Sequence, residues 1–350
     1  ARLVSVTRAL IPADILIGIS PWVKHVWDLK SFDLSALIVA IISYLAAAWI
    51  MLLRLVKTVR ENDWTKGTPW LLALATLSLL LVGPISFFTM WDRLYLGYFT
   101  GNPYHNPTYL LLRPFALGLY FVVSDGFFAK WSWKNSLIAS LLLIFATLSK
   151  PSLTLTFLPT IGILILIHYK EWKKTNWSFL VFSIGLLGAI ILAWQYWVTY
   201  LGQAGDSIII APFKAILIYV PNIPTAIFFV LMSILFPISV AIFYWKEVKG
   251  QISFQIAWIN FLIGLGMAII LAEAITTSHL NFWWGPMIGV FLLFYCSLEI
   301  WLKNIIDGST NEIRLKKKDI VILTIFILHL VCGILYFIKV FINIDPSVVH

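Results

Sequence analysis

Residues with side chains suited to chemistry gather in a few short segments that separate long apolar runs. Asp14 lies within an aliphatic stretch, and Lys150 stands directly before Pro151. Residues 91–113 and 273–285 hold the other candidates, which are Asp92, Asn102, His105, Asn106, Arg113, Glu273, His279 and Asn281. Carboxylates and imidazoles exchange protons with hydroxyl groups, and ammonium and guanidinium groups bind phosphate. These residues are therefore candidates for acid–base chemistry and anion binding.

The composition indicates that most of the surface faces lipid. Of the 350 residues, 61% are hydrophobic and 12% are charged, and the mean hydropathy is +0.92. A soluble domain carries about a quarter charged residues. With 17 Trp and 25 Phe in addition, the chain has too little polar surface to face water. We therefore predict a protein embedded in a bilayer.

Ten apolar runs are candidate membrane helices, since a bilayer core of about 30 Å needs about 20 apolar residues in helical form. They are 35–53, 70–90, 109–128, 135–149, 152–168, 177–199, 223–245, 253–274, 282–302 and 319–341. The fourth and fifth are short and are divided by Lys150-Pro151, which predicts a tight helical hairpin. We predict an all-α, polytopic transmembrane bundle in which residues 1–350 form a single domain. Residues 1–34 are an amphipathic segment, and the ten helices occupy 35–341. Because the chain starts at Ala1 without Met, we expect one more span before it, eleven in all.

The basic residues predict the orientation. Five alternate connections hold most of the 25 Lys and Arg residues, and they begin with Arg54, Lys57, Arg60 and Lys66 after the first span. Cytoplasmic loops carry such an excess. The net charge of +9 therefore reflects topology, which argues against a nucleic-acid partner. Residues 1–34, 91–108, the turn at Lys150, 200–222 and 275–281 are then non-cytoplasmic.

The candidate residues each have a functional and a structural interpretation. The loop 91–113 is either the wall of a cavity or an interfacial aromatic belt with helix-capping residues, and Arg113 either binds a substrate or reaches the interface. Lys150 either binds a lipid phosphate or anchors a helix end at headgroup height. Glu273 could pair with Arg113 or Lys150, or position a substrate hydroxyl. Asp14 is either a helix N-cap or a catalytic carboxylate.

Other features are assigned structural roles or argue against particular functions. The segment 200–215 is expected to lie along the interface without spanning. We expect Asp125 and Glu299 to be structural, and His168, His329, Cys296 and Cys332 to be explained by packing. The sequence has no Walker loop, dinucleotide glycine fingerprint, CxxC pair or HExxH motif, which argues against nucleotide hydrolysis and zinc chemistry.

The arrangement resembles the GT-C glycosyltransferases, polytopic enzymes that take a sugar from a lipid-phosphate carrier on the non-cytoplasmic side. Asp14, the loop 104–108 leading to Arg113-Pro114-Phe115, Lys150-Pro151 and the turn 273–281 carry the likeness. Members usually show an acidic pair in the first such loop, whereas Asp14 stands alone with Asp28 and Asp33 more distant. Either a segment before Ala1 holds the expected acid, or the activity has changed.

The resemblance implies an inverting sugar transfer from a polyprenyl-phosphate-type carrier to a glycan, lipid or protein acceptor. Asp14 would act as the general base, and Arg113 and Lys150 would stabilise the phosphate leaving group. The substrate-binding residues would be Asp92, Asn102, His105, Asn106, Glu273, His279 and Asn281. No cofactor is certain, because some relatives use a divalent cation and others do not. The implied location is the plasma membrane, with the active face non-cytoplasmic.

Three alternatives remain open at this point. A membrane transporter would show inverted repeats and broken helices that meet near the bilayer midplane. A polysaccharide polymerase or an acyltransferase would share the lipid-carrier chemistry. A non-catalytic subunit of a larger membrane complex would have no chemistry of its own, and the single acid in the first loop is compatible with that interpretation.

Overall fold

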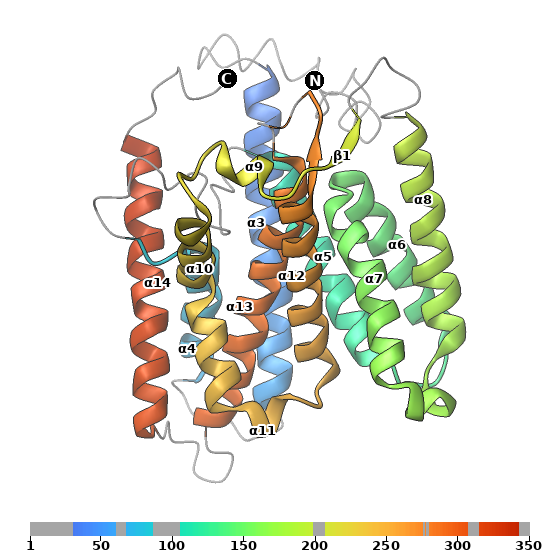
Figure 1. Cartoon of the computed structure of the whole chain (residues 1–350). Helices are drawn as coiled ribbons and strands as arrows, with labels where there is room; N and C mark the ends of the chain where they lie inside the picture. Colours follow the sequence, from blue (N-terminus) through green and yellow to red (C-terminus); the bar gives the residue numbers. More distant parts are fainter. Residues whose placement is uncertain are drawn as a thin grey trace.

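The computed structural model is a helical bundle (Figure 1), and it describes residues 31–60, 68–86, 106–198, 207–275, 277, 280–306 and 315–342. The long helices are α3 (Ser31–Arg60), α5 (Pro107–Gly126), α8 (Leu187–Tyr196) with the π-helical η4 (Phe179–Leu186) before it, α10 (Ile223–Phe243), α12 (Ile252–Ile270), α13 (Trp284–Ile305) and α14 (Lys317–Ile342). Three shorter apolar helices are α4 (Thr68–Leu81), α6 (Trp133–Ser149) and α7 (Ser152–Ile167). The remaining elements are η3 (Tyr169–Lys174), β1 (Ile208–Ile210), α9 (Lys214–Leu217), α11 (Trp245–Val248), β2 (Leu271–Glu273) and η7 (Asn281–Trp283).

The predicted class of a polytopic helical membrane protein is confirmed at this level. In the described part of the chain, seven helices are long and apolar enough to cross a membrane, and α4, α6 and α7 are apolar but shorter. Each of the ten predicted runs overlaps one of these helices, although 70–90 and 253–274 extend past the ends of α4 and α12. The sequence did not predict the strands β1 and β2, which pair antiparallel with Ile208 opposite Glu273.

The bundle has two distinct ends. One end, here called the sheet end, carries β1, β2, α9 and the start of α3, at the top of Figure 1. The other end, here called the basic end, carries η3 and α11, whose residues include Lys170, Lys173, Lys174 and Lys246. The distribution of lysines predicts that the basic end is cytoplasmic and that the sheet end is not.

Helix α13 forms the centre of the bundle. In its most apolar stretch 94% of the residues are buried, against 17% for α3 and 22% for α14. Glycines let α12 approach α13 closely, because a Cβ atom on Gly264 would lie 2.7 Å from the backbone nitrogen of Pro286. A Cβ atom on Gly289 would similarly lie 2.8 Å from the Cα atom of Phe261. Such small-residue contacts bring membrane helices into close packing.

The second predicted span, 70–90, is wrong at residues 82–86, and residues 87–90 lie outside the described residues. Helix α4 ends at Leu81, and residues 82–86 continue as non-helical backbone that is buried at residues 83–85. This segment packs against a kink in α10 at Ile234 and against α14. Backbone hydrogen bonds join Ile85 N–H to the Met232 carbonyl and Gly83 N–H to the His329 carbonyl. The break is tolerated because these neighbours satisfy the freed backbone groups.

The predicted hairpin at Lys150-Pro151 is confirmed, and its turn is recessed. Helix α6 ends at Ser149 and α7 begins at Ser152. At about 1.5 Å per residue, these helices of 17 and 16 residues span only about 25 Å each. In Figure 1 the turn between them lies below the upper ends of α3 and α8. Lys150 is the first residue of this turn.

Candidate functional site

Two of the predicted cations, Lys150 and Arg113, meet a group of aromatic side chains toward the sheet end of the bundle. The ring centroids of Tyr109 and Trp284 are 5.2 Å apart, which joins the first turn of α5 to the start of α13. Lys150 contacts one of these rings and Arg113 contacts the other. We call this group the cation–aromatic cluster, and its members are Tyr44, Tyr109, Arg113, Lys150, Trp284 and Phe291.

Lys150 lies on the face of Trp284, with its Nζ atom 3.8 Å from the ring centroid. Its backbone N–H donates to the Ala146 carbonyl and closes the last turn of α6. The half-buried side chain is therefore fixed by the helix end below it and by the indole ring beside it. An ammonium held in this way places a fixed positive charge at the α6–α7 turn.

Arg113 occupies a more enclosed position in the same cluster. Its guanidinium carbon lies 4.8 Å from the Phe291 ring centroid, 5.1 Å from that of Tyr109 and 5.6 Å from that of Tyr44. The residue is only 7% exposed. The substrate-binding role of Arg113 remains a prediction. Arg113 places a buried positive charge beside Tyr109, whose ring lies 5.2 Å from that of Trp284, the ring that Lys150 contacts.

Asn106 caps the start of α5, and helix capping was the structural interpretation given above for polar residues of the loop 91–113. Its side-chain oxygen accepts hydrogen bonds from the Tyr109 backbone N–H at 3.1 Å and from the Thr108 hydroxyl at 2.6 Å. Pro107 follows at the first helical position, where its missing N–H has no cost. The cap fixes the start of α5, and with it the position of Tyr109. The Tyr109 hydroxyl then donates to the Met287 carbonyl at 3.1 Å and ties α5 to α13.

Two of the predicted substrate-binding residues, Glu273 and Asn281, lie together, and their binding role remains a prediction. The amide of Asn281 donates to the Glu273 carboxylate at 2.5 Å, and the Thr277 hydroxyl donates to the Glu273 carbonyl. Glu273 is 3% exposed and ends β2. Asn281 begins η7, which leads directly into Trp284 of the cation–aromatic cluster. The hydrogen bond from Asn281 therefore ties the buried carboxylate of β2 to the element that leads into the cluster.

Five of the predicted site residues lie outside the described residues. They are the proposed base Asp14 and the substrate-binding candidates Asp92, Asn102, His105 and His279. Their predicted roles remain predictions. In the part of the chain that the structure describes, no three His, Cys, Asp or Glu side chains are grouped so that they could hold a metal ion.

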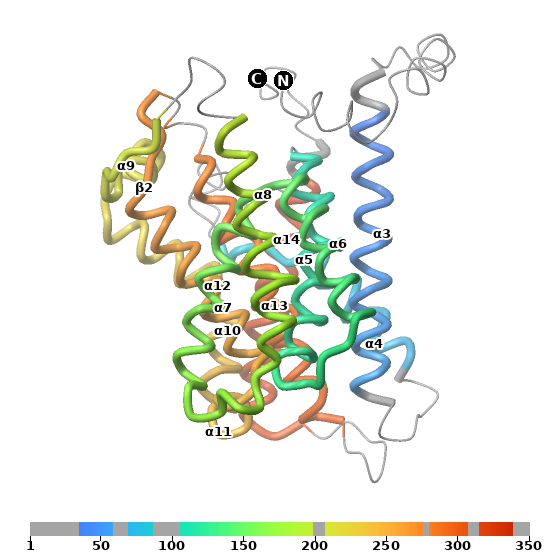
Figure 2. The backbone as a smooth tube through the Cα atoms, turned by 90° about the vertical axis from the view of Figure 1, so that its right-hand side faces the viewer, coloured from blue at the N-terminus to red at the C-terminus, as the bar shows by residue number. Residues whose placement is uncertain are grey.

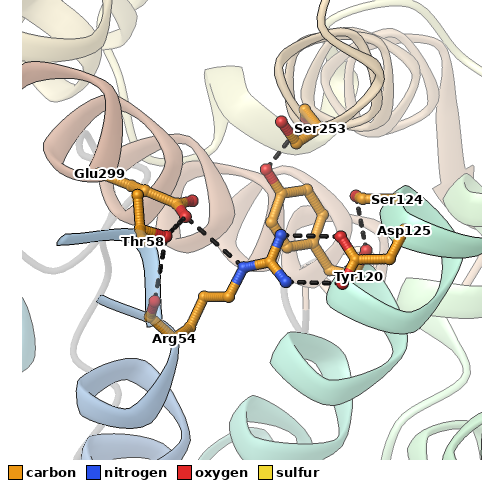
Figure 3. Close-up of polar contacts among 7 residues, drawn as sticks. All are labelled: Arg54, Thr58, Tyr120, Ser124, Asp125, Ser253 and Glu299. Atoms are coloured by element: carbon orange, nitrogen blue, oxygen red, sulfur yellow. Dashed lines mark hydrogen bonds and ion pairs between the residues drawn. The ribbon is translucent and has the colours of Figure 1, made fainter. Parts of the chain in front are cut away.

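An ion-pair network at the basic end was not predicted from the sequence (Figure 3). Arg54 of α3 donates through both terminal nitrogens to the Asp125 carboxylate of α5, at 2.6 and 2.8 Å. Its Nε atom lies 3.5 Å from Glu299 of α13, which also accepts a 2.6 Å hydrogen bond from the Thr58 hydroxyl. The predicted span 35–53 ended one residue before Arg54, whereas α3 continues to Arg60. The structural role predicted for Asp125 and Glu299 agrees with this geometry.

The histidines in the described residues also have defined hydrogen-bond partners. His329 lies 2.6 Å from the Gly83 carbonyl through Nδ1 and accepts from the Phe236 backbone N–H at 3.3 Å through Nε2. These two contacts require a neutral ring with its proton on Nδ1. His168 contacts Gln255 at 2.7 Å and Glu171 at 3.3 Å. Both histidines therefore link helices through hydrogen bonds. The sequence predicted only packing roles for them and did not predict these hydrogen bonds.

Comparison of the chain with family models, with curated proteins and with solved structures finds no match. The functional interpretation therefore depends on the geometry of the cation–aromatic cluster and its neighbours.

Proposed function

We propose that the chain is an integral membrane glycosyltransferase of the GT-C type, which moves a sugar from a polyprenyl-phosphate-type carrier to an acceptor at the non-cytoplasmic face. The observation that carries the proposal is the position of Lys150, which stands in the α6–α7 turn and is fixed on the face of Trp284. A lipid phosphate lies at the boundary between hydrocarbon and water, and lysine binds phosphate as a point charge.

The proposed reaction uses the cluster as the site of the leaving group. The acceptor hydroxyl attacks the anomeric carbon, the bond from that carbon to the phosphate oxygen breaks, and the phosphate leaves with the electron pair. Asp14 takes the proton of the hydroxyl. Lys150 stabilises the negative charge that develops on the phosphate. The buried Arg113 adds a second positive charge to the same cluster and stabilises that negative charge further. Glu273 and Asn281 orient the sugar hydroxyls. The proposal assigns no step to a metal ion.

Turnover in reconstituted vesicles tests the proposal. Purified protein is incorporated into vesicles with a radiolabelled polyprenyl-phosphate sugar and a pool of candidate acceptors. Lys150→Gln and Asp14→Asn should each reduce transfer strongly, while Lys134→Gln, an exposed lysine at the start of α6, should not. Full transfer by the Lys150→Gln/Asp14→Asn double variant would overturn the proposal.

Transport is the second candidate function, and the break after α4 favours it. Transporter sites form near the midplane between discontinuous helices. Here the end of α4 meets the kink at Ile234, which lies midway along α10, and His329, which lies midway along α14. Movement of the sugar lipid across the same vesicles without acceptor, unaffected by Lys150→Gln, would favour transport over transfer.

A further inference from the structure

Apolar side chains are exposed on the small sheet and on the helix beside it. Ile210 of β1 and Ile275, which follows β2, are each 79% exposed. Ile208, Leu217 and Ile218 are also exposed. We call this surface the apolar lip, and it consists of Ile208, Ile210, Leu217, Ile218 and Ile275. Because β1 pairs with β2 and β2 contacts α9, these exposed side chains lie in one region of the surface, and such a group of exposed apolar residues marks a surface that contacts something other than water.

The apolar lip is held on a defined backbone. Its strands are paired with each other, and further hydrogen bonds extend the pairing on both sides, from Ala274 N–H to the Ser207 carbonyl and from Ala211 N–H to the Ile270 carbonyl. Phe213 N–H donates to the Ile269 carbonyl. The lip is therefore attached rigidly to the end of α12. In Figure 2, α9 and β2 lie at the edge of the bundle opposite α3.

Two observations identify the partner as the lipid bilayer. First, the lip lies next along the chain to exposed apolar residues of two candidate membrane helices, which are Ile270 at the end of α12 and Ile223 and Ile227 at the start of α10. Second, the exposed Lys214 stands at the start of α9, beside the lip, and a lysine in this position suits the phosphates of lipid headgroups.

The backbone limits how deep the lip can lie. In the described residues the sheet has two strands, and β2 is largely buried while β1 is exposed, so the outer edge of β1 faces the surroundings without a partner strand among these residues. Unpaired backbone groups are not tolerated in the hydrocarbon core, but they are satisfied by water and headgroups at the boundary. We propose that the apolar lip is inserted into the headgroup boundary of the leaflet at the sheet end. The inserted lip attaches β2, the strand that contains Glu273, to the lipid surface. This inference does not depend on the proposed sugar transfer.

Depth measurements on labelled protein test the inference. In a chain with Cys296→Ala and Cys332→Ala, an environment-sensitive fluorophore is attached at Ile210→Cys and, in a second variant, at Ile275→Cys. Both are reconstituted into phosphatidylcholine vesicles with some anionic lipid. A label at Gln251→Cys, which is exposed at the basic end, is the control for a position in water. Size-exclusion profiles show that each variant is folded.

The labels on the lip should lose intensity with nitroxide lipids labelled near the headgroup and should resist iodide in water, whereas the Gln251 label should show the reverse. Quenching of both lip labels by iodide to the extent seen at Gln251 would overturn the inference. Protection of both labels from iodide and from nitroxide lipid would also overturn it, because protein would then cover the lip.

Discussion

Removal of Arg54 should destabilise the protein more than removal of either of its carboxylate partners. Arg54→Met keeps most of the side-chain length but leaves Glu299, whose side chain is 14% exposed, without its cation. Breaking a buried pair from one side costs about 3–5 kcal/mol. Since the Asp125 side chain is 49% exposed and water screens it, we expect the lower end, about 3 kcal/mol.

The two carboxylate variants should cost less for different reasons. Asp125→Asn leaves Arg54 with Glu299, and the amide oxygen still accepts one hydrogen bond, so we expect a loss of about 1 kcal/mol. Glu299→Gln removes a buried charge while an amide oxygen can still accept from Thr58, and the loss should again be about 1 kcal/mol.

The assay is unfolding by SDS titration, followed by circular dichroism, of the protein in detergent micelles. Lys57→Met is the matched control, because Lys57 is exposed on the same helix three residues after Arg54. Its effect should remain within about 0.5 kcal/mol. Equal losses for Arg54→Met and Lys57→Met would refute the reasoning, and so would a loss for Asp125→Asn as large as that for Arg54→Met.

Three further predictions concern other contacts, each measured by the same unfolding assay. His329→Leu should cost about 2–6 kcal/mol, because two buried backbone groups lose their partner at about 1–3 kcal/mol each, and an unchanged midpoint would contradict this. Gly289→Ala should cost about 1–3 kcal/mol, since the new Cβ atom meets the backbone of Phe261, and no loss would show that α12 and α13 separate freely. Burial and the hydrogen bond to Asp319 raise the pKa of Tyr244 above its usual value of 10.0. The folded chain then keeps a proton that the unfolded chain releases, so stability should fall as the pH rises above about 10. Tyr244→Phe should make this slope shallower, and an unchanged slope would contradict the prediction.

The helices could be predicted because their lengths and apolar composition are local properties of the sequence. Lys150-Pro151 marked the hairpin turn for the same reason, since proline cannot continue a helix. The end of α4 at Leu81 was also signalled, by Gly83-Pro84, but the apolar run continues through these residues and hides the break. Length alone therefore overestimated the second span.

The contacts between helices could not be predicted. Arg54 and Asp125 are 71 residues apart, and Arg54 in isolation reads as one more basic residue of a cytoplasmic loop. The meeting of Lys150 with Trp284 likewise depends on the close approach of α12 and α13 to the α6–α7 hairpin. Asn106 differs, because its capping role is a local feature that Asn-Pro at the start of a helix predicts. The aromatic residues around it in the sequence also suggested a binding role.

Binding of a polyprenyl phosphate to the purified protein tests the central claim most directly, since it needs neither the sugar nor the acceptor. Native mass spectrometry of the wild type, Lys150→Gln and Lys134→Gln with the same lipid gives the three dissociation constants. The proposal predicts that Lys150→Gln weakens binding about tenfold or more, as loss of a charge-assisted contact requires, while Lys134→Gln binds as the wild type does. Equal binding by all three proteins would contradict the assignment of Lys150 to the lipid phosphate.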